Sequence, residues 1–317
     1  MRLPGRDKPV RASRSFRTRR EAVEWAALKE QKIRQRTEKD PRLQHTLRDA
    51  LHRYADEVSP TKRGEHWERI RLNAFEGYNL PLDKPLIKVT PQDIADFRDS
   101  RALSISNGSV RREISLLSSV FQIAMLEWGW TDKNPCRMIR KPPNSKHRER
   151  IIHWWETKRM LRSMGYRQHG EIETTSQAAA MCMLTALRTG MRAGELTGMT
   201  WGQVFERHCH LPKTKTGRPR DVPLSLKAKA LIERMRGWHD ELVFGISPAT
   251  LDTLFRRYRD RAGLEGFTFH DTRHTAATMI SRKVDVLDLC KIFGWADPKM
   301  AMVYYNPDAE SLADLLD

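Results

Sequence analysis

The sequence predicts a mainly α-helical protein with a small antiparallel β-sheet in its second half, which is an α+β fold. Apolar side chains recur every three or four residues along most of the 317 positions, which is the spacing of one helix face. Only residues 203–224 depart from it, with short alternating segments around a Gly-Arg-Pro turn, as expected for a β-hairpin. Hydrophobic residues make up 39% of the chain, enough for packed cores, and the length suggests two domains at about 150 residues each.

The first half contains helices whose starts and ends are marked by local signals. A basic amphipathic helix is expected around residues 22–33, and another helix is expected to run to about Glu76. Thr90 precedes a proline and an acidic first turn, which is the pattern of a helix start. Residues 110–128 carry apolar side chains at helical spacing, so we expect a long helix that ends at Gly129.

The second half is expected to begin with a helix over residues 174–188, rich in alanine, methionine and leucine. The predicted hairpin at 203–224 follows, and helices then resume. Polar residues beside apolar patterns mark three further helix starts, at Ser247, His270 and Asp297.

Shifts in composition divide the chain into four parts. These are a basic N-terminal segment at 1–40, a helical domain at 41–140, a linker at 141–150 and a second domain at 151–317. The linker is rich in bases and contains two prolines. Both a solvated connector and a contact with a DNA backbone explain such a composition.

The charge of the chain predicts a polyanionic partner. There are 57 basic and 40 acidic residues, a net charge of +17, and the segments 1–40, 41–150 and 151–317 carry +7, +6 and +4. Because the positive charge is spread over every segment, the sequence favours a protein that contacts nucleic acid along its length over one with a single basic tail. A solvated basic surface is the alternative.

Several classes of protein are disfavoured by what the sequence lacks. There is no run of about 18 apolar residues, so no transmembrane helix is expected, and the basic N-terminus lacks the apolar stretch of a signal peptide. The four cysteines are far apart and include no C-x-x-C pair, which predicts free thiols in a reducing cytoplasm. They are Cys136, Cys182, Cys209 and Cys290.

Four short motifs in the second half carry the candidate chemistry. They are TGMRAGEL at 189–196, KTKTGRPRDVPL at 213–224, HDTRHT at 270–275 and FGWADPKMAMVYYNP at 293–307. Alone, each has an ordinary structural interpretation. Arg192 and Glu195, for example, have the spacing of a surface ion pair on a helix. Tyr304 could likewise be an ordinary core residue.

Together and in this order, the motifs resemble those of the tyrosine recombinase family of the phage-integrase type. The family pattern is an arginine, a lysine on a hairpin, His-x-x-Arg, a histidine or tryptophan after a glycine, and a tyrosine nine residues later. The matching residues are Arg192, Lys215, His270, Arg273, Trp295 and Tyr304. Histidine is more usual at the position of Trp295, which we expect to offer an indole N–H to a phosphate in place of a titrating proton.

The resemblance implies a helical core-binding domain at 41–140 and a catalytic domain at 151–317, which together form a C-shaped clamp on DNA. Residues 1–40 then correspond to the remnant of an arm-binding domain. The implied function is site-specific recombination that integrates or excises phage, prophage or other mobile DNA in the bacterial cytoplasm. The implied partners are double-stranded DNA attachment sites, three further copies in a synaptic tetramer that forms a Holliday junction, and host or phage architectural and directionality proteins.

The residue types at the matched positions suit an attack on a phosphodiester. Arg192 and Arg273 can each place a forked pair of donors on the non-bridging oxygens, which gain negative charge during the reaction. His270 and Trp295 add further donors. Because the chain supplies this positive charge itself, we expect neither a metal nor another cofactor.

The nucleophile, the acid and a supporting residue complete the predicted site. The resemblance implies that Tyr304 forms a 3′-phosphotyrosine, which conserves the energy of the broken bond. The family spacing of nine residues from the position of Trp295 falls on Tyr304, whereas Tyr305 is ten residues away. Lys215, on the predicted hairpin, is expected to protonate the leaving 5′-oxygen. Glu195 is expected to orient its neighbours.

Other functions remain open at this point. A topoisomerase of type IB would use similar chemistry without a partner site, and a non-catalytic DNA-binding regulator would need only the basic surface. A metal-dependent nuclease is disfavoured because no cluster of paired carboxylates occurs. The tract at 208–210, His-Cys-His, has no second ligand pair at zinc spacing, so zinc is disfavoured as well.

Two segments at the ends of the second domain carry expectations of their own. Trp154 and Trp155 are expected to pack where the domain begins and not to stack on bases. Residues 303–317 contain four acids, three leucines and no base. This segment is expected to make protein contacts, either with a neighbouring subunit or with its own.

Overall fold

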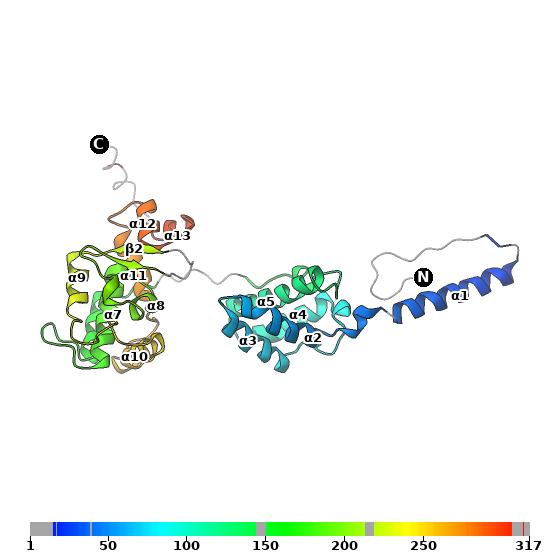
Figure 1. The fold of residues 1–317 in the computed structure, drawn as a ribbon, viewed down its shortest axis with the longest axis horizontal. Coiled ribbons are helices and arrows are strands. Elements are labelled where there is room, and N and C mark those ends of the chain that lie inside the picture. The colour runs from blue at the N-terminus through cyan, green and yellow to red at the C-terminus, as the bar shows by residue number, and fades with distance from the viewer. Residues whose placement is uncertain are drawn as a thin grey trace. The chain divides into compact units, whose positions relative to one another are not determined.

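The computed structural model describes residues 15–16, 18–38, 40–143, 150–212, 219–305 and 313. The chain forms two compact units, Met1–His147 and Arg148–Asp317 (Figure 1). Helices dominate both units, and the described residues contain one two-stranded antiparallel sheet. The predicted fold class, mainly helical with a small antiparallel sheet, is therefore confirmed.

The division between the two units falls inside the segment predicted as a linker. Residues 144–149 of that segment lie outside the described residues, and so do the hairpin turn at 213–218 and the tail residues 306–312 and 314–317. The domain boundaries, the role of Lys215 and the contacts of the C-terminal segment therefore stay predictions.

From Leu47 onward, the first unit is built from helices and short helical turns around one apolar core. Its α-helices are α1 (Arg19–Glu38), α2 (Leu47–Arg53), α3 (Glu65–Ala74), α4 (Pro91–Ala102) and α5 (Asn107–Leu126). The helix predicted around residues 22–33 is thus confirmed as part of α1. The helix expected to run to Glu76 ends at Ala74, and a 3₁₀ turn at Phe75–Gly77 continues it.

Local sequence explains where α4 and α5 begin and end. Thr90 and Asp93 form a reciprocal capping box at the start of α4, in which each side chain accepts a hydrogen bond from the other residue's backbone N–H. The apolar face of α5 is buried from Val110 to Ala124, as its spacing predicts. The helix ends at Leu126, three residues before Gly129, whose φ of 65° is the left-handed conformation that glycine favours.

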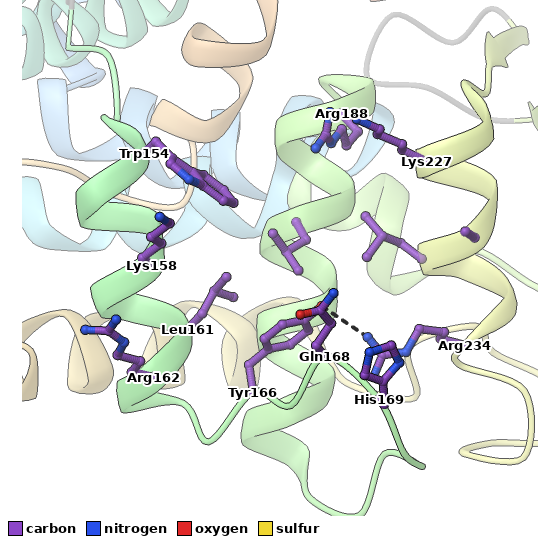
Figure 2. Close-up of a pocket in the computed structure, with 13 residues that line it drawn as sticks. Trp154, Lys158, Leu161, Arg162, Tyr166, Gln168, His169, Arg188, Lys227 and Arg234 are labelled. Atoms are coloured by element: carbon purple, nitrogen blue, oxygen red, sulfur yellow. Dashed lines mark hydrogen bonds between the residues drawn. The ribbon is translucent and has the colours of Figure 1, made fainter.

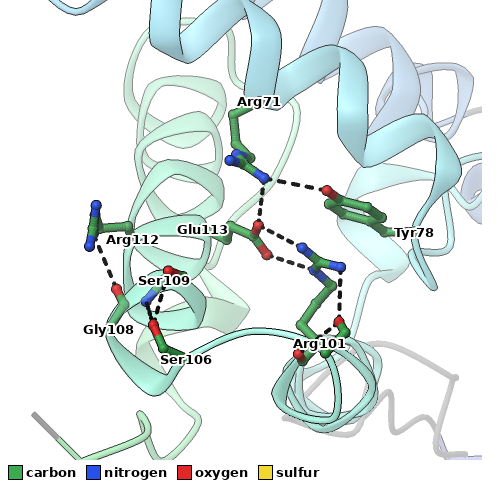
Figure 3. A network of polar contacts seen from close by, with 9 residues as sticks. Arg71, Tyr78, Arg101, Ser106, Gly108, Ser109, Arg112 and Glu113 are labelled. Atoms are coloured by element: carbon green, nitrogen blue, oxygen red, sulfur yellow. Dashed lines mark hydrogen bonds and ion pairs between the residues drawn. The ribbon is translucent and has the colours of Figure 1, made fainter. Parts of the chain in front are cut away.

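A buried carboxylate ties three helices of the first unit together. Glu113 on α5 has 2% of its side chain exposed and accepts hydrogen bonds from Arg71 on α3 at 2.9 Å and from Arg101 on α4 at 2.9 and 3.1 Å (Figure 3). Arg71 also donates to the hydroxyl of Tyr78 at 3.3 Å. Because a buried carboxylate is costly without such partners, the pairing fixes how these helices pack.

The second unit places helices around one long buried helix, with a two-stranded sheet beside them. Its elements are α6 (Trp154–Ser163), α7 (Thr175–Thr189), α8 (Ala193–Thr197), β1 (His208–Leu211), β2 (Arg220–Pro223), α9 (Leu226–Glu233), α10 (Pro248–Arg261), α11 (Asp271–Ile280), α12 (Val286–Phe293) and α13 (Lys299–Met302). The helix starts predicted at Ser247 and His270 are confirmed, since these residues are the N-caps of α10 and α11.

The central element of the second unit is α7, which is buried almost all round and contacts α8, α9, α10 and α11 (Figure 1). It begins at a capping box between Thr174 and Gln177 and ends at Gly190, in the left-handed conformation with φ of 66°. The predicted hairpin is present as β1 and β2, with Cys209 opposite Val222. The first strand is shorter than predicted, because Val204 forms only an isolated bridge and the strand begins at His208.

The expectation for the two tryptophans at the start of α6 is wrong. Trp154 and Trp155 have 57% and 58% of their surface exposed, so neither packs into the core. The reason is positional: the buried face of α6 consists of Glu156, Thr157, Met160 and Leu161. All four cysteines are free and buried, as the expectation of reduced thiols requires.

The side chains of the His-Cys-His tract make contacts within the second unit. Cys209 is buried, His210 contacts Asp221 across the sheet at 2.8 Å, and His208 stacks on Phe205. Among the described residues, no group of three or more His, Cys, Asp or Glu side chains is placed to hold a metal ion. Nor is any described helix long and apolar enough to cross a membrane.

Candidate active site

Five predicted residues lie at the ends of helices in the second unit. Arg192 is the N-cap residue of α8, and Glu195 lies one turn into that helix. His270 is the N-cap of α11 and Arg273 lies in its first turn. Trp295 follows the glycine that ends α12. The contacts described next bring these segments, together with Tyr304 after α13, into one cluster.

Glu195 is the centre of an ion-pair network that sequence reasoning only half predicted. It has 6% of its side chain exposed and accepts hydrogen bonds from the Arg192 guanidinium at 2.8 Å and the Arg192 backbone N–H at 2.8 Å. A third donor is Arg220 on β2, at 2.6 Å. Burial alone would raise the pKa of Glu195, but Arg220 and Arg192 hold it below its usual range, so the carboxylate stays ionised.

Arg273 connects the first and last motifs. Its side chain is buried, and its two terminal nitrogens donate to the carbonyls of Gly190 and Phe293, both at 2.7 Å. Burial lowers the pKa of Arg273, and the nearby charges of Arg192 and Arg220 lower it further. The three guanidiniums outnumber the single carboxylate, so the cluster favours the arrival of an anion.

Two glycines allow this close packing. Gly190 has a φ of 66°, and a Cβ there would lie 2.3 Å from the Phe293 ring. Gly294 has a φ of 65°, and a Cβ there would lie 2.8 Å from the Arg220 side chain. Both positions therefore need a residue without a side chain, which explains the glycines in the first and last motifs.

Tyr304 sits in a turn just beyond α13. The helix α13 ends at Met302, and the Tyr304 backbone N–H donates to the Ala301 carbonyl at 2.9 Å. The half-buried ring of Tyr304 stacks on Trp295, with centroids 5.4 Å apart and planes 5° apart. Burial raises the pKa of Tyr304, and Arg273 offsets part of this rise.

Two histidines of α11 complete the cluster. His270 is exposed, and its ring meets that of His274 edge to face, with centroids 5.1 Å apart. The Nδ1 of His274 is in hydrogen-bonding contact with the hydroxyl of Tyr304.

Sequence reasoning missed two residues of this cluster, Arg220 and His274. Both lie inside motifs that were singled out. Arg220 follows the turn in the hairpin motif, and His274 is next to Arg273 in HDTRHT. The signal that could have identified them was their residue type, because an arginine and a histidine within motifs expected to contact a phosphate are themselves candidates for that contact. Lys215 is the one predicted site residue that lies outside the described residues.

A separate concave surface lies between α6, α7 and α9 and contains none of the predicted site residues (Figure 2). Its volume is about 690 Å³, and its apolar floor includes Leu161, Leu184 and Leu231. Arg234 is held in place by the Tyr166 hydroxyl at 3.1 Å. The basic side chains that line it are Lys158, Arg162, Arg188, Lys227 and Arg234.

Comparison with known proteins identifies the class. Residues 156–311 match the Phage integrase family. The chain is 36% identical to a Haemophilus influenzae protein provisionally named integrase/recombinase. The match covers 93% of this chain and 97% of that protein. The chain therefore belongs to the phage integrase family, and it is an enzyme of the tyrosine-type site-specific recombinase family, as its motifs predict.

Further relatives and solved structures agree. The chain is 32% identical to the shufflon-specific DNA recombinase of Escherichia coli, over 86% of this chain and 72% of that protein. Its fold matches a lambda integrase dimer bound to a COC′ core site, with a TM-score of 0.70 and 21% identity over 83% of this chain and 96% of that one. It also matches a lambda integrase tetramer bound to a Holliday junction, with a TM-score of 0.69 and 21% identity over 82% of this chain and 77% of that one.

Proposed function

We propose that this recombinase cleaves duplex DNA at a specific site through a 3′-phosphotyrosine on Tyr304 and rejoins the strand to a partner site. In doing so it integrates or excises phage, prophage or other mobile DNA. The observation that carries the proposal is a cluster of three guanidiniums and one carboxylate, in which two of the guanidiniums pair with the carboxylate, beside a half-buried tyrosine. This cluster has an excess of positive charge where a phosphodiester must gain negative charge.

The binding step uses the charged part of the cluster. Arg192 and Arg273 hold the non-bridging oxygens, and Glu195 and Arg220 position Arg192 through their ion pairs. His270, which is exposed at the N-terminus of α11, adds a donor to the phosphate. Trp295 offers its indole N–H while its ring, stacked on Tyr304, sets the direction of the nucleophile.

The bond-breaking step uses Tyr304 and Lys215. The Tyr304 oxygen attacks phosphorus as the bond to the 5′-oxygen breaks, and Lys215 protonates that leaving oxygen. The guanidiniums neutralise the developing charge, so no metal is required by this mechanism.

DNA binding is proposed to use both units, because residues 41–150 and 151–317 are both basic. Four copies assemble on two attachment sites, by analogy with the lambda integrase dimer on a core site and tetramer on a Holliday junction. Architectural and directionality proteins act as further partners, and the site of action is the bacterial cytoplasm.

The test is a suicide duplex that carries the DNA flanking this gene, nicked so that the short fragment diffuses away after cleavage. Wild-type protein should form a covalent complex in excess chelator. Tyr304→Phe should bind the duplex but trap nothing, whereas Tyr305→Phe should still trap. Trapping that is lost on chelation and restored by magnesium would contradict the mechanism. Relaxation of supercoiled DNA without exchange between two sites would instead support a topoisomerase-like function.

A further inference from the structure

The contact between Tyr304 and His274 has no role in the mechanism described so far. The hydroxyl of Tyr304 is in hydrogen-bonding contact with Nδ1 of His274, and the two rings lie 5.9 Å apart with planes 28° apart. In this contact the phenol can donate its proton to a neutral imidazole, which then accepts at Nδ1 and carries its own proton on Nε2.

Neighbouring groups hold the Tyr304 side of this contact in place. His274 itself is half-buried on α11, and the Thr278 hydroxyl donates to its backbone carbonyl at 3.1 Å, a bond within the helix that does not touch the ring. Trp295 stacks on the Tyr304 ring, and the Ser281 hydroxyl donates to the Tyr304 carbonyl at 2.8 Å. The titratable groups next to the pair on α11 are His270, whose ring meets that of His274, and Arg273, whose charge acts on Tyr304.

The nucleophile needs a group that removes its proton. A phenol with an ordinary pKa of about 10 is almost fully protonated at neutral pH and is a poor nucleophile in that form. Burial raises the pKa of Tyr304 further, although Arg273 offsets part of the rise. Histidine is the side chain whose ordinary pKa, about 6.5, allows it to accept a proton near neutral pH.

We propose that His274 is the general base of the cleavage reaction and therefore a further catalytic residue. This inference rests on the proposed function of Tyr304. As the bond from the Tyr304 oxygen to phosphorus forms, the phenolic proton passes to Nδ1 of His274. The bond from phosphorus to the 5′-oxygen breaks with its electron pair on that oxygen, which takes a proton from Lys215.

Rejoining reverses these transfers. The 5′-hydroxyl attacks phosphorus and returns its proton to Lys215, while the departing phenolate of Tyr304 takes back the proton from His274. In this scheme His270 is left to act on the phosphate oxygens. The two histidines of HDTRHT then have different roles, although they lie one helical turn apart.

The test compares two variants of α11. His274→Asn keeps an amide acceptor close to the position of Nδ1 but cannot take a proton, so it separates the base from the hydrogen bond. Thr278→Ala is the matched control, because it removes a side-chain hydrogen bond to the His274 backbone and leaves the ring untouched. We expect His274→Asn to trap the covalent complex on the order of 10²–10⁴-fold more slowly at pH 7. Thr278→Ala should stay within about twofold of wild type, and DNA affinity should be unchanged in both.

Two further readouts distinguish a base from a merely structural residue. Without a base the reaction needs the phenolate, so trapping by His274→Asn should accelerate about tenfold per pH unit between roughly pH 7 and 9. A substrate with sulfur in place of the bridging 5′-oxygen needs no proton on its leaving group. It should therefore rescue Lys215→Ala and should not rescue His274→Asn.

Each result bears on the inference separately from the proposed function. Trapping by the wild-type protein on unmodified DNA tests the proposed function, whereas the ratio of variant to wild type tests the base. A near-wild-type rate for His274→Asn, a pH profile equal to that of the wild type, or its rescue by the sulfur substrate would overturn the assignment.

Discussion

Glu113 in the first unit and Glu195 in the second are both buried beside arginines, but the two clusters leave different charges unpaired. In the first unit, the guanidiniums of Arg71 and Arg101 both bond directly to the Glu113 carboxylate. These ion pairs hold three helices together. They therefore stabilise the fold and leave little positive charge for a ligand.

The second cluster also combines one buried glutamate with arginines, but it leaves one guanidinium without a carboxylate partner. Glu195 pairs with Arg192 and Arg220, but the third guanidinium, that of Arg273, donates to the neutral carbonyls of Gly190 and Phe293. Carbonyls orient a guanidinium without neutralising it. The comparison shows that the acceptor of each arginine, and not the number of arginines, separates a structural ion pair from an anion-binding site.

Between these two clusters, the largest effect is expected when the unneutralised arginine, Arg273, is changed. Arg273→Lys keeps the charge but loses the fork that bonds two carbonyls and a phosphate at once. We expect single-turnover trapping to slow by about 10²–10³-fold, as for the loss of one donor to a developing anion. Arg71→Lys, in the first cluster, is the control and should trap at the wild-type rate. Similar losses in both variants would remove the distinction between the clusters.

The next largest effect is expected on the stability of the protein, when the glutamate of the first cluster is changed. Glu113→Gln leaves two guanidiniums beside a neutral amide, and we expect a loss of about 2 kcal/mol in the free energy of unfolding, measured with urea. This value allows for the partial exposure of Arg71 and Arg101, at 29% and 13%. The protein that remains folded should trap DNA at the wild-type rate. A slower rate without a loss of stability would show that Glu113 acts on the site.

The equivalent substitution in the second cluster, Glu195→Gln, should lower activity more than it lowers stability. Glu195→Gln frees Arg192 and Arg220 from their shared acceptor, so the phosphate is held less well positioned, and we expect trapping to slow about tenfold. DNA affinity in a filter-binding titration should not fall, because the cluster becomes more positive. Weaker binding would show instead that Glu195 is needed to keep the site folded.

The smallest effect compares a charged helix cap in the first unit with a neutral one in the second. Burial alone would raise the pKa of Asp93, but its hydrogen bonds with Lys84 and Thr90 hold it below its usual range. A carboxyl with a lowered folded pKa stabilises the protein above its unfolded pKa of about 3.9, and this contribution is lost as the pH falls through the folded pKa.

Asp93→Asn should therefore cost about 1 kcal/mol at pH 7, and the cost should shrink as the pH falls below the unfolded pKa and through the lowered folded pKa. Gln177→Ala, in the uncharged capping box of α7, should have a cost independent of pH over the same range. Urea denaturation of both variants at several pH values measures the difference. A pH-independent cost for Asp93→Asn would mean that its carboxylate contributes only as a hydrogen-bond acceptor.

Features that depend on residues close in the chain were predictable from the sequence. Thr90 and Asp93 lie within one helical turn, so their order alone predicts the start of α4, and the apolar spacing of α5 predicts its buried face. The helical fold class with one hairpin follows from the same local patterns. The candidate site residues could also be proposed from the sequence, because the four motifs together and in order resemble those of the tyrosine recombinase family.

Contacts between distant residues were decided by the tertiary structure alone. Arg220 reaches Glu195 across 25 positions, and the Tyr304 hydroxyl meets His274 across 30. No periodicity or capping signal refers to pairs so far apart, because they depend on how β2, α8 and α11 pack. The exposure of Trp154 and Trp155 has the same origin, since it depends on which face of α6 meets the core. The sequence by itself thus determined which groups are available, and packing decided which of them touch.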